Sequence, residues 1–354
     1  MDGELKNFIK VWTLAITCLC YCYYIASRIP KGMLRLLSLL PVLFLFLTLP
    51  FDLTSVHLGG VTAFFLIWLG TFKLLLFSFD QGPLSPPPPN LFLFISIACL
   101  PIKLTSQDAN NPSHQKINNT KPHPAVKPSS NILMPRSLLL MSIKVMLLAM
   151  ILYSYNYRQH MHPYLLLSLL CLHMYIELEF VLAICATPAS ILLGFDLEPQ
   201  FNEPYLSTSL QDFWGRRWNL MVTSILRPTV YIPVRQSCAP FIGSTLASLP
   251  AIIITFVVSG LMHELLYYHL TRATPTWEVT WFFVLHGFCT AVELAVKKAV
   301  ADRWLLPPVV SGPLTAGFVV VTAFWLFCPQ IIRNGVHEKI IGEIFSVLRI
   351  YVKR

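Results

Sequence analysis

The most informative stretch of the chain is Val257-Val258-Ser259-Gly260-Leu261-Met262-His263-Glu264-Leu265, because it places a histidine and a glutamate inside a long apolar run. The run covers residues 241–269, which exceeds the roughly 20 residues that a helix needs to cross a bilayer. Ionisable side chains are costly at membrane depth and are therefore typical of functional sites. The stretch predicts a membrane-spanning helix in which His263 and Glu264 are candidates for chemistry.

The composition of the whole chain supports this interpretation. Of the 354 residues, 55% are hydrophobic and 12% are charged, and the mean hydropathy is +0.62. Soluble domains carry about 25% charged residues. We therefore expect an integral membrane protein whose main environment is the lipid bilayer, and we expect no nucleic-acid partner.

Apolar segments of sufficient length predict an all-α fold, a polytopic transmembrane bundle of eight or nine spans with interfacial helices. The apolar segment 91–102 is only twelve residues long, and this length favours a re-entrant or interfacial piece over a ninth span. The first span lacks a small-residue cleavage site and should be retained, so we expect one integral-membrane domain over residues 1–354. The eight candidates are 8–26, 36–50, 58–79, 137–153, 164–186, 241–269, 277–296 and 309–331.

Two segments between the spans differ in character. Residues 80–136 predict a proline-rich, disordered loop, since Ser85-Pro86-Pro87-Pro88-Pro89 is a stiff spacer and 105–136 is polar. Residues 187–240 hold Trp, Phe, Tyr and Pro among charges. That mixture favours ordered helices lying at the membrane interface.

The distribution of Lys and Arg predicts the orientation. With eight spans, the loops on one side carry 15 basic residues and those on the other carry 9, with Lys10 counted in the N-terminus. The positive-inside rule places the first side, including 80–136 and 187–240, in the cytosol. The acceptor sequon Asn118-Asn119-Thr120 should then carry no glycan.

A polar segment, Gln211-Asp212-Phe213-Trp214-Gly215-Arg216-Arg217-Trp218-Asn219, belongs in no hydrocarbon core. Arginines pair with phosphates through charge-assisted hydrogen bonds. If the segment is helical, Trp214 and Trp218 share one face at i, i+4. The alternative is an interfacial aromatic belt with positive-inside arginines, which needs no ligand.

The position of His263 in its helix suits a catalytic base. Pro250 can serve as the first helical residue, which puts His263 about 20 Å along the helix. Tyr267, Tyr268 and Arg272 mark the far interface. An imidazole, with an ordinary pKa of about 6.5, is the natural general base at neutral pH. The alternative is a histidine that hydrogen-bonds neighbouring helices.

Two other pairs compete for that role: His286 with Glu293, seven residues apart, and His173 with Glu177, at i, i+4. For both pairs we expect a role in packing or in lining a tunnel, because neither lies near an equivalent of the small Ser259-Gly260 pair, which allows close approach of helices. Glu264 lies about 100° around the helix from its neighbour His263 and need not share its face.

The nine cysteines predict neither a disulfide framework nor a metal site. Their number is odd and nearly all lie in apolar runs. Cysteines 18, 20 and 22 are two residues apart, so they diverge around a helix instead of converging on one ligand.

Taken with these motifs, the chain resembles plant wax synthases, which belong to the membrane-bound O-acyltransferase superfamily. The resemblance runs over nearly the whole length and is most specific where residues 212–219 occur together with 259–264. Three further stretches carry it: His57-Leu58-Gly59-Gly60, Phe72-Lys73-Leu74-Leu75-Leu76-Phe77 and Pro199-Gln200-Phe201-Asn202-Glu203-Pro204-Tyr205.

The resemblance implies an acyl-CoA:alcohol O-acyltransferase of the endoplasmic reticulum, with helices around an intramembrane tunnel. The superfamily's catalytic histidine maps onto His263, and its signature asparagine maps onto Asn219. Arg216 and Arg217 are the expected contacts of the CoA phosphates, although the superfamily's motif is often more acidic here. The other expected substrate-binding residues are Trp214, Trp218, Glu264 and His286.

The implied reaction uses acyl-CoA as co-substrate and needs no further cofactor, covalent acyl-enzyme or metal. His263 takes the hydroxyl proton of the acceptor, and Asn219 holds or polarises the thioester carbonyl. The acceptor is a long-chain alcohol, giving wax esters, or a sterol. A membrane transporter also carries intramembrane His and Glu, and a structural scaffold is a third alternative; the absence of an internal repeat disfavours the transporter.

Overall fold

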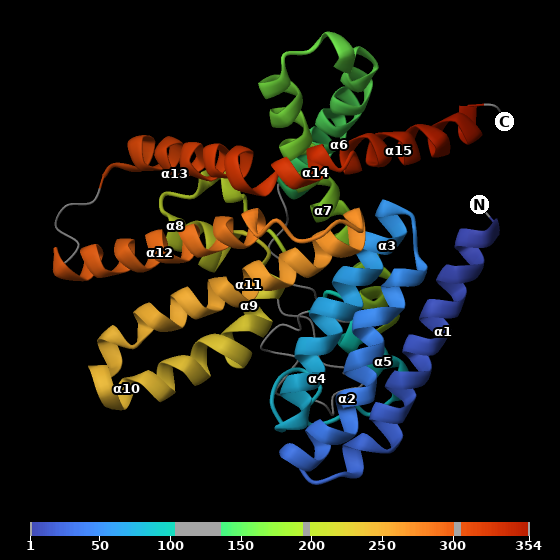
Figure 1. Ribbon diagram of the computed structural model, residues 1–354, viewed down its shortest axis with the longest axis vertical. Helices are drawn as coiled ribbons and strands as arrows, with labels where there is room; N and C mark the ends of the chain where they lie inside the picture. The colour runs from blue at the N-terminus through green and yellow to red at the C-terminus, as the bar shows by residue number, and fades with distance from the viewer. Residues whose placement is uncertain (1, 103–135, 194–198, 301–305, 353–354) are drawn as a thin grey trace, which may run out of the picture.

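The computed structural model describes residues 2–102, 136–193, 199–300 and 306–352 (Figure 1). Over these residues the chain is helical without strands, and eight helices are long and apolar enough to cross a membrane. The predicted polytopic helical bundle is thereby confirmed. The predictions for residues 105–135, including the sequon, lie outside the described residues. The eight spans are 3–28, 33–52, 56–78, 138–160, 163–188, 248–271, 278–299 and 308–327.

The N-terminal third of the chain forms one group of helices, drawn in blue and cyan in Figure 1. A π-helical turn, η3 (Phe64–Gly70), interrupts the third span. The buried core of the group includes Leu19, Leu39, Phe46 and Phe77. Its helices are α1 (Asp2–Tyr24), α2 (Met33–Thr48), α3 (Val56–Ala63), α4 (Thr71–Ser78) and α5 (Leu91–Cys99).

The nine-residue helix α5 occupies the apolar piece predicted at residues 91–102, so the loop 80–136 is ordered in part. It is about 13 Å long, too short to span, and its Phe94 and Ile97 are buried in the N-terminal core. Lys73 of α4 is fully buried and donates to the carbonyls of Ile97 at 2.6 Å and Leu100 at 2.8 Å. This cation satisfies the carbonyls at the end of α5, where no intrahelical donor remains.

The helices α6 (Arg136–Ser154) and α7 (Pro163–Leu193) pack on the C-terminal part of the chain. Ile341 of α15 (Val336–Val352) lies in one buried cluster with residues of α6 and α7. The chain reaches α15 through α13 (Pro308–Thr322), the π turn η8 (Ala323–Phe327) and α14 (Pro329–Arg333), and α13, α14 and α15 follow one another across the upper part of Figure 1.

The span that carries His263 begins later than the sequence predicts. Gly243 has a φ of +80°, a conformation that glycine adopts without steric penalty, and it kinks the helix at this point. Gly243 lies inside α10 (Ile232–Leu246), and α11 (Ser248–Thr271) begins after Ala247. Pro250 is therefore the third helical residue of α11, not the first.

Two glycines allow α11 to approach α12 (Glu278–Ala299) closely. A Cβ added at Gly260 would lie 3.0 Å from the Cα of Thr280, and one at Gly287 would lie 2.6 Å from the Cβ of Phe256. Small residues at such crossings permit tight helix packing in membranes. The predicted close approach at Ser259-Gly260 is confirmed, and it sets His263 directly against α12.

Short helices run through residues 199–231, as expected for an ordered interfacial segment. They are η5 (Pro204–Leu206), α8 (Leu210–Asp212), the π turn η6 (Phe213–Arg217), α9 (Leu220–Leu226) and the π turn η7 (Arg227–Tyr231). The Asn202 N–H donates to the Arg217 carbonyl at 2.9 Å, and the Leu220 N–H donates to Gln200 at 2.8 Å. These bonds hold residues 199–205 beside residues 211–219, here called the Trp-Arg segment.

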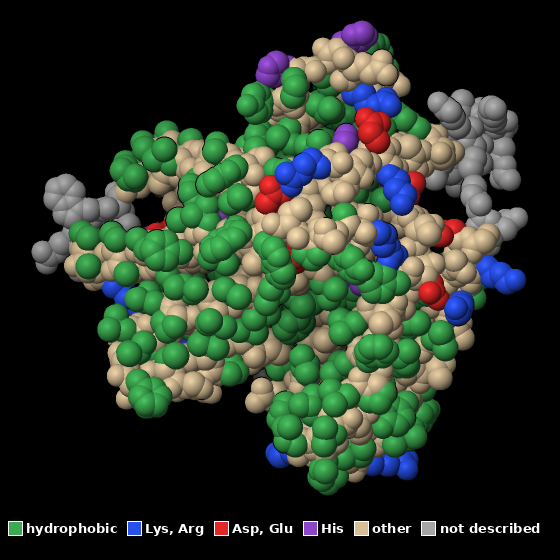
Figure 2. Space-filling view, in the orientation of Figure 1, with side chains coloured by type: hydrophobic (Ala, Val, Ile, Leu, Met, Phe, Trp, Pro, Cys, Tyr) green, Lys and Arg blue, Asp and Glu red, His purple; other side chains and the backbone are tan. Residues whose placement is uncertain are grey.

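The outer face is largely apolar, as a bilayer requires. Figure 2 shows hydrophobic side chains over most of one face, while charged side chains gather at the upper right, around the C-terminal helices. Phe241, Val309 and Trp325 are among the large exposed hydrophobic residues. This distribution fits a multi-pass membrane protein.

Candidate active site

His263 of α11 has the protonation pattern of a neutral base. Its Nδ1 lies 2.8 Å from the carbonyl oxygen of Ser259, one helical turn earlier. A carbonyl oxygen only accepts, so Nδ1 carries the proton, and in the neutral ring the lone pair lies on Nε2. The side chain is half-buried. The helix thus fixes the tautomer that can take a proton from a substrate hydroxyl.

Aromatic side chains from three parts of the chain surround this imidazole. Phe283 of α12 stacks on it with ring centroids 4.1 Å apart. Trp68 of η3 meets it at 4.7 Å with an interplanar angle of 83°, and Phe327 of η8 lies at 5.9 Å. Aromatic contacts of this kind suit an apolar acyl chain or alcohol.

His286, the competing base, has both ring nitrogens occupied. Its Nδ1 accepts from the indole N–H of Trp214 at 3.0 Å, which leaves the proton on Nε2. That nitrogen lies 2.8 Å from the Thr322 hydroxyl oxygen, and the side chain is fully buried. With no free lone pair, His286 is a hydrogen-bonding partner of Trp214, and the geometry favours His263 as the base.

The two tryptophans of the polar segment do not stack on a common helix face as predicted. Phe213–Arg217 forms a π turn and Trp218 is extended, so the i, i+4 geometry is lost. Trp214 and Trp218 meet at 6.3 Å and 71°, while Trp218 stacks on Phe213 at 5.3 Å and 18°. Trp214 also contacts Phe283 at 5.7 Å, which links it to the ring that covers His263.

Asn219 lies at the start of α9 in a left-handed conformation, with φ 38° and ψ 68°. Its Oδ1 accepts from the N–H of Val222 at 3.3 Å, a helix N-cap that anchors the side chain. Because Oδ1 is bound to the backbone, the amide NH₂ is the group left for a ligand. The contacts that connect Asn219 to His263 run through Trp218, Trp214 and Phe283.

The two arginines have different environments. Arg217 pairs with Asp212 at 2.6 Å and donates to the carbonyl of Asn202 at 3.2 Å, so its charge is already used within the loop. Arg216 is exposed. Both line a polar cavity of about 290 Å³ together with Lys297 of α12, which no motif in the sequence singles out and whose Nζ pairs with Glu293 at 2.6 Å. The remaining lining residues are Thr208, Ser209, Gln211 and Asp212.

Glu264 is buried and binds the start of α12. Its two oxygens accept from the Trp277 N–H at 3.0 Å and from the Thr280 hydroxyl at 3.1 Å, at the start of α12. The carboxylate therefore caps the N-terminus of α12, where negative charge is favourable. Contact of Glu264 with substrate stays a prediction; these bonds already occupy both oxygens within the protein.

The third candidate pair belongs to a separate polar network. His173 Nε2 lies 3.6 Å from Glu177, which also lies 2.9 Å from His57 of α3. The other nitrogen of His57 lies 2.6 Å from Glu343 of α15. Burial alone would raise the pKa of Glu343, but hydrogen bonds from His57, the Val56 N–H and Ser55 outweigh it and lower that pKa to about 2. The network joins α3, α7 and α15.

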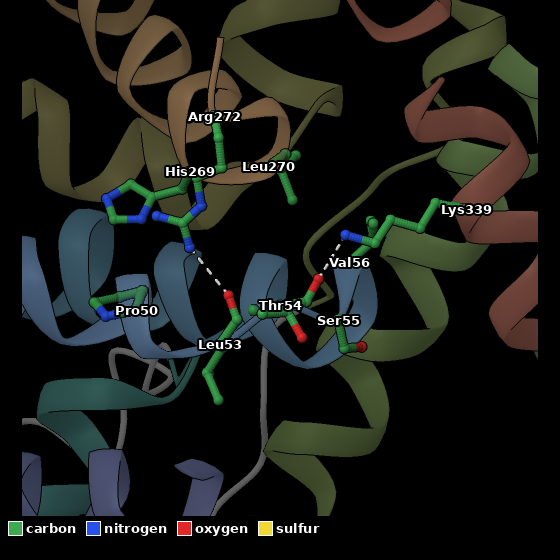
Figure 3. Close-up of a pocket in the computed structure, with 10 residues that line it drawn as sticks. Pro50, Leu53, Thr54, Ser55, Val56, His269, Leu270, Arg272 and Lys339 are labelled. Carbon is green, nitrogen blue, oxygen red and sulfur yellow. Dashed lines mark hydrogen bonds between the residues drawn. The ribbon is translucent and has the colours of Figure 1, made fainter. Parts of the chain in front are cut away.

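A second, smaller pocket of about 90 Å³ lies at the end of α11 (Figure 3). Arg272 donates to the carbonyls of Phe51 and Leu53, both at 3.0 Å, and Lys339 donates to Thr54 at 2.7 Å. Burial lowers the pKa of Arg272. These bonds connect the end of α11 and α15 to the turn before α3, so we assign the pocket a structural role.

Comparison with known proteins identifies the class. The sequence pattern of the membrane bound O-acyl transferase family matches residues 197–285, the part that carries Trp214, Asn219 and His263. Probable long-chain-alcohol O-fatty-acyltransferase 1 of Arabidopsis thaliana is 49% identical over 98% of this chain and 97% of its own.

Two further relatives bear on the acceptor. The long-chain-alcohol O-fatty-acyltransferase of Simmondsia chinensis is 48% identical over 97% of this chain and 94% of its own. Acyl-CoA–sterol O-acyltransferase 1 of Arabidopsis thaliana is 42% identical over 97% and 95%. The transporter and scaffold interpretations are therefore wrong. The chain is an acyltransferase that belongs to the wax synthase family of membrane-bound O-acyltransferases.

Proposed function

We propose that this protein transfers the acyl group of acyl-CoA to a long-chain alcohol and so makes a wax ester. The observation that carries the proposal is the fixed tautomer of His263, a free Nε2 lone pair within an aromatic enclosure. A base in such a site meets an apolar alcohol without competing water.

In the proposed reaction the alcohol hydroxyl donates its proton to Nε2 of His263 as its oxygen attacks the thioester carbonyl carbon. The carbon–sulfur bond then breaks, and the imidazolium returns the proton to the leaving thiolate. The products are an ester and free CoA thiol, so no proton is gained or lost overall. The Nδ1 bond to Ser259 holds the ring in one orientation through both transfers.

The Trp-Arg segment receives acyl-CoA in this proposal. Asn219, held by its cap to Val222, directs its NH₂ toward the thioester. Trp214 and Trp218 contact the acyl chain near the carbonyl. Arg216, at the cavity of about 290 Å³, binds CoA phosphates by charge-assisted hydrogen bonds, while Lys297 beside it is paired with Glu293 at 2.6 Å. Arg217 acts chiefly by keeping the loop in shape.

A sterol is the second candidate acceptor, because the 42% identical relative is named as a sterol acyltransferase. The long-chain alcohol is favoured by the higher identity to the enzymes named for alcohols, 48% and 49%. The protein resides in the endoplasmic reticulum membrane in this proposal, with residues 187–240 on the cytosolic side where acyl-CoA is available.

The test is an assay of membranes from cells that lack both activities, with radiolabelled palmitoyl-CoA and a choice of hexadecanol or a sterol. Wax ester formation that depends on expression of the chain supports the proposal. Steryl ester as the dominant product would replace the alcohol by a sterol, and neither product would contradict the function.

A further inference from the structure

The indole N–H of Trp68 is a buried donor without an acceptor. The side chain is only 1% exposed, and among the described residues its Nε1 has no hydrogen-bond partner. Buried polar groups are nearly always hydrogen-bonded, and an exception calls for an explanation such as a catalytic role. Trp in particular finds a partner for its N–H when buried.

Neighbouring tryptophans follow the usual rule, so the exception is specific to Trp68. The indole of Trp12, which packs on the same cluster, donates to the Thr62 hydroxyl at 3.3 Å. The indole of Trp214 donates to His286 at 3.0 Å. The fold therefore supplies acceptors to the indoles on either side and none to Trp68.

The position of Trp68 is beside the reacting group. Its ring lies 4.7 Å from His263 and nearly perpendicular to it, while Phe283 stacks on the imidazole at 4.1 Å. Trp68 belongs to the π turn η3, an irregularity that is frequent at functional sites. Gly70 keeps this turn against α2, because a Cβ there would lie 2.8 Å from the ring of Phe46.

We infer that Trp68 Nε1–H is an oxyanion donor of the acyl transfer. When the alcohol oxygen bonds to the thioester carbon, the carbonyl electron pair moves to its oxygen, and His263 holds the hydroxyl proton. The indole N–H donates to that oxyanion. The pair then returns, the carbon–sulfur bond breaks, and the thiolate takes the proton from His263. This inference rests on the proposed function, since it needs His263 as the base.

Geometry explains why a donor here acts on the transition state. The buried indole packs in one cluster with Leu69 and Phe72, so it does not reorganise as charge develops. A donor in a dry site strengthens with the charge on the oxygen and binds the oxyanion better than the neutral carbonyl.

The test removes the N–H and keeps the shape. Benzothienylalanine, in which sulfur replaces the indole nitrogen, is incorporated at position 68, and the same replacement at Trp12 is the matched control. We expect kcat at position 68 to fall by about 10²–10³-fold, the usual effect of losing one oxyanion donor, with KM for acyl-CoA and alcohol nearly unchanged. The Trp12 replacement should leave kcat within about threefold, because that donor serves only Thr62.

A second readout separates catalysis from folding. A fatty acyl dithioester of CoA develops charge on sulfur, which accepts hydrogen bonds weakly. The ratio of thioester to dithioester rates should therefore drop toward one in the position 68 variant, and Trp68→Phe should behave in the same way. A merely structural defect would lower both rates together and leave the ratio unchanged.

Normal kcat, or an unchanged rate ratio, in a folded Trp68 variant overturns the inference. His263→Ala is assayed in parallel to keep the two proposals distinguishable. An inactive His263→Ala beside a fully active Trp68 variant removes only the role of Trp68. An active His263→Ala removes the proposed function itself.

Discussion

Replacing Gly260 by Ala should disturb the catalytic imidazole through one added methyl group. The new Cβ would lie 3.0 Å from the Cα of Thr280, 3.2 Å from its carbonyl oxygen and 3.3 Å from the Cβ of Phe283. The closest of these atoms is α12 backbone, so a side-chain rotation cannot relieve it. The helix itself must shift.

The size of the effect follows from those distances. Carbon atoms pack at about 3.5–4.0 Å, so α12 must withdraw by about 0.5 Å. Overpacking of this kind costs about 1–3 kcal/mol. Phe283 moves with α12 and stacks on His263 at 4.1 Å. Because misplacement by about 1 Å can cost about 10²-fold in rate, we expect kcat to fall about tenfold.

The matched control is Gly317→Ala in α13, another transmembrane helix, where nothing lies within 4 Å of the added Cβ. Both variants gain the same helix propensity, about 1 kcal/mol, so their difference reports packing alone. Thermal unfolding in detergent and ester formation in membranes are measured for both. Equal stability and equal turnover in the two variants would refute this description of the α11–α12 contact.

Two more predictions follow from charged groups. Arg216→Ala should raise the KM for acyl-CoA about tenfold with little change in the KM for the alcohol. Arg217→Ala should instead reduce the amount of folded protein, because it breaks the ion pair with Asp212 at 2.6 Å. Steady-state kinetics and size-exclusion chromatography distinguish the two effects, and identical behaviour of the two variants would contradict this assignment. The pKa of Glu343 falls from 4.5 to about 2 on folding, so its stabilisation is complete above about pH 4.5 and is lost as pH falls through about 2. The melting temperature of wild type should drop across that window and that of Glu343→Gln much less; parallel curves would contradict the role of this carboxylate.

Hydropathy was sufficient to predict the spans, because each must be long and apolar whatever its neighbours are. Hydropathy also identified His263 as a candidate, since an ionisable side chain in a membrane-spanning helix is costly and is typical of a functional site. Hydropathy did not predict the local irregularities of the helices. The break at Gly243 and the π turn at Phe213–Arg217 depend on packing from other helices, so the start of α11 and the pairing of Trp214 with Trp218 were wrong.

Long-range partners were beyond the sequence for the same reason. Nothing local indicates that Glu264 caps α12, or that His57 meets Glu343, 286 residues later. His286 and His263 both lie in apolar helices, and only their partners in the fold show that both ring nitrogens of His286 are hydrogen-bonded while, among the described residues, Nε2 of His263 is not. Trp68 lies among apolar residues and gives no signal until its missing acceptor is seen.

The central claim, that Nε2 of His263 is the catalytic base, is tested most directly by single-turnover ester formation in His263→Ala and His286→Gln with saturating acyl-CoA and hexadecanol. We expect the first variant to lose about 10²–10⁴-fold in the rate of the chemical step while still reaching the membrane. The second should retain more activity, because His286 only holds Trp214. A near-normal rate in His263→Ala, or a larger loss in His286→Gln, would contradict the account.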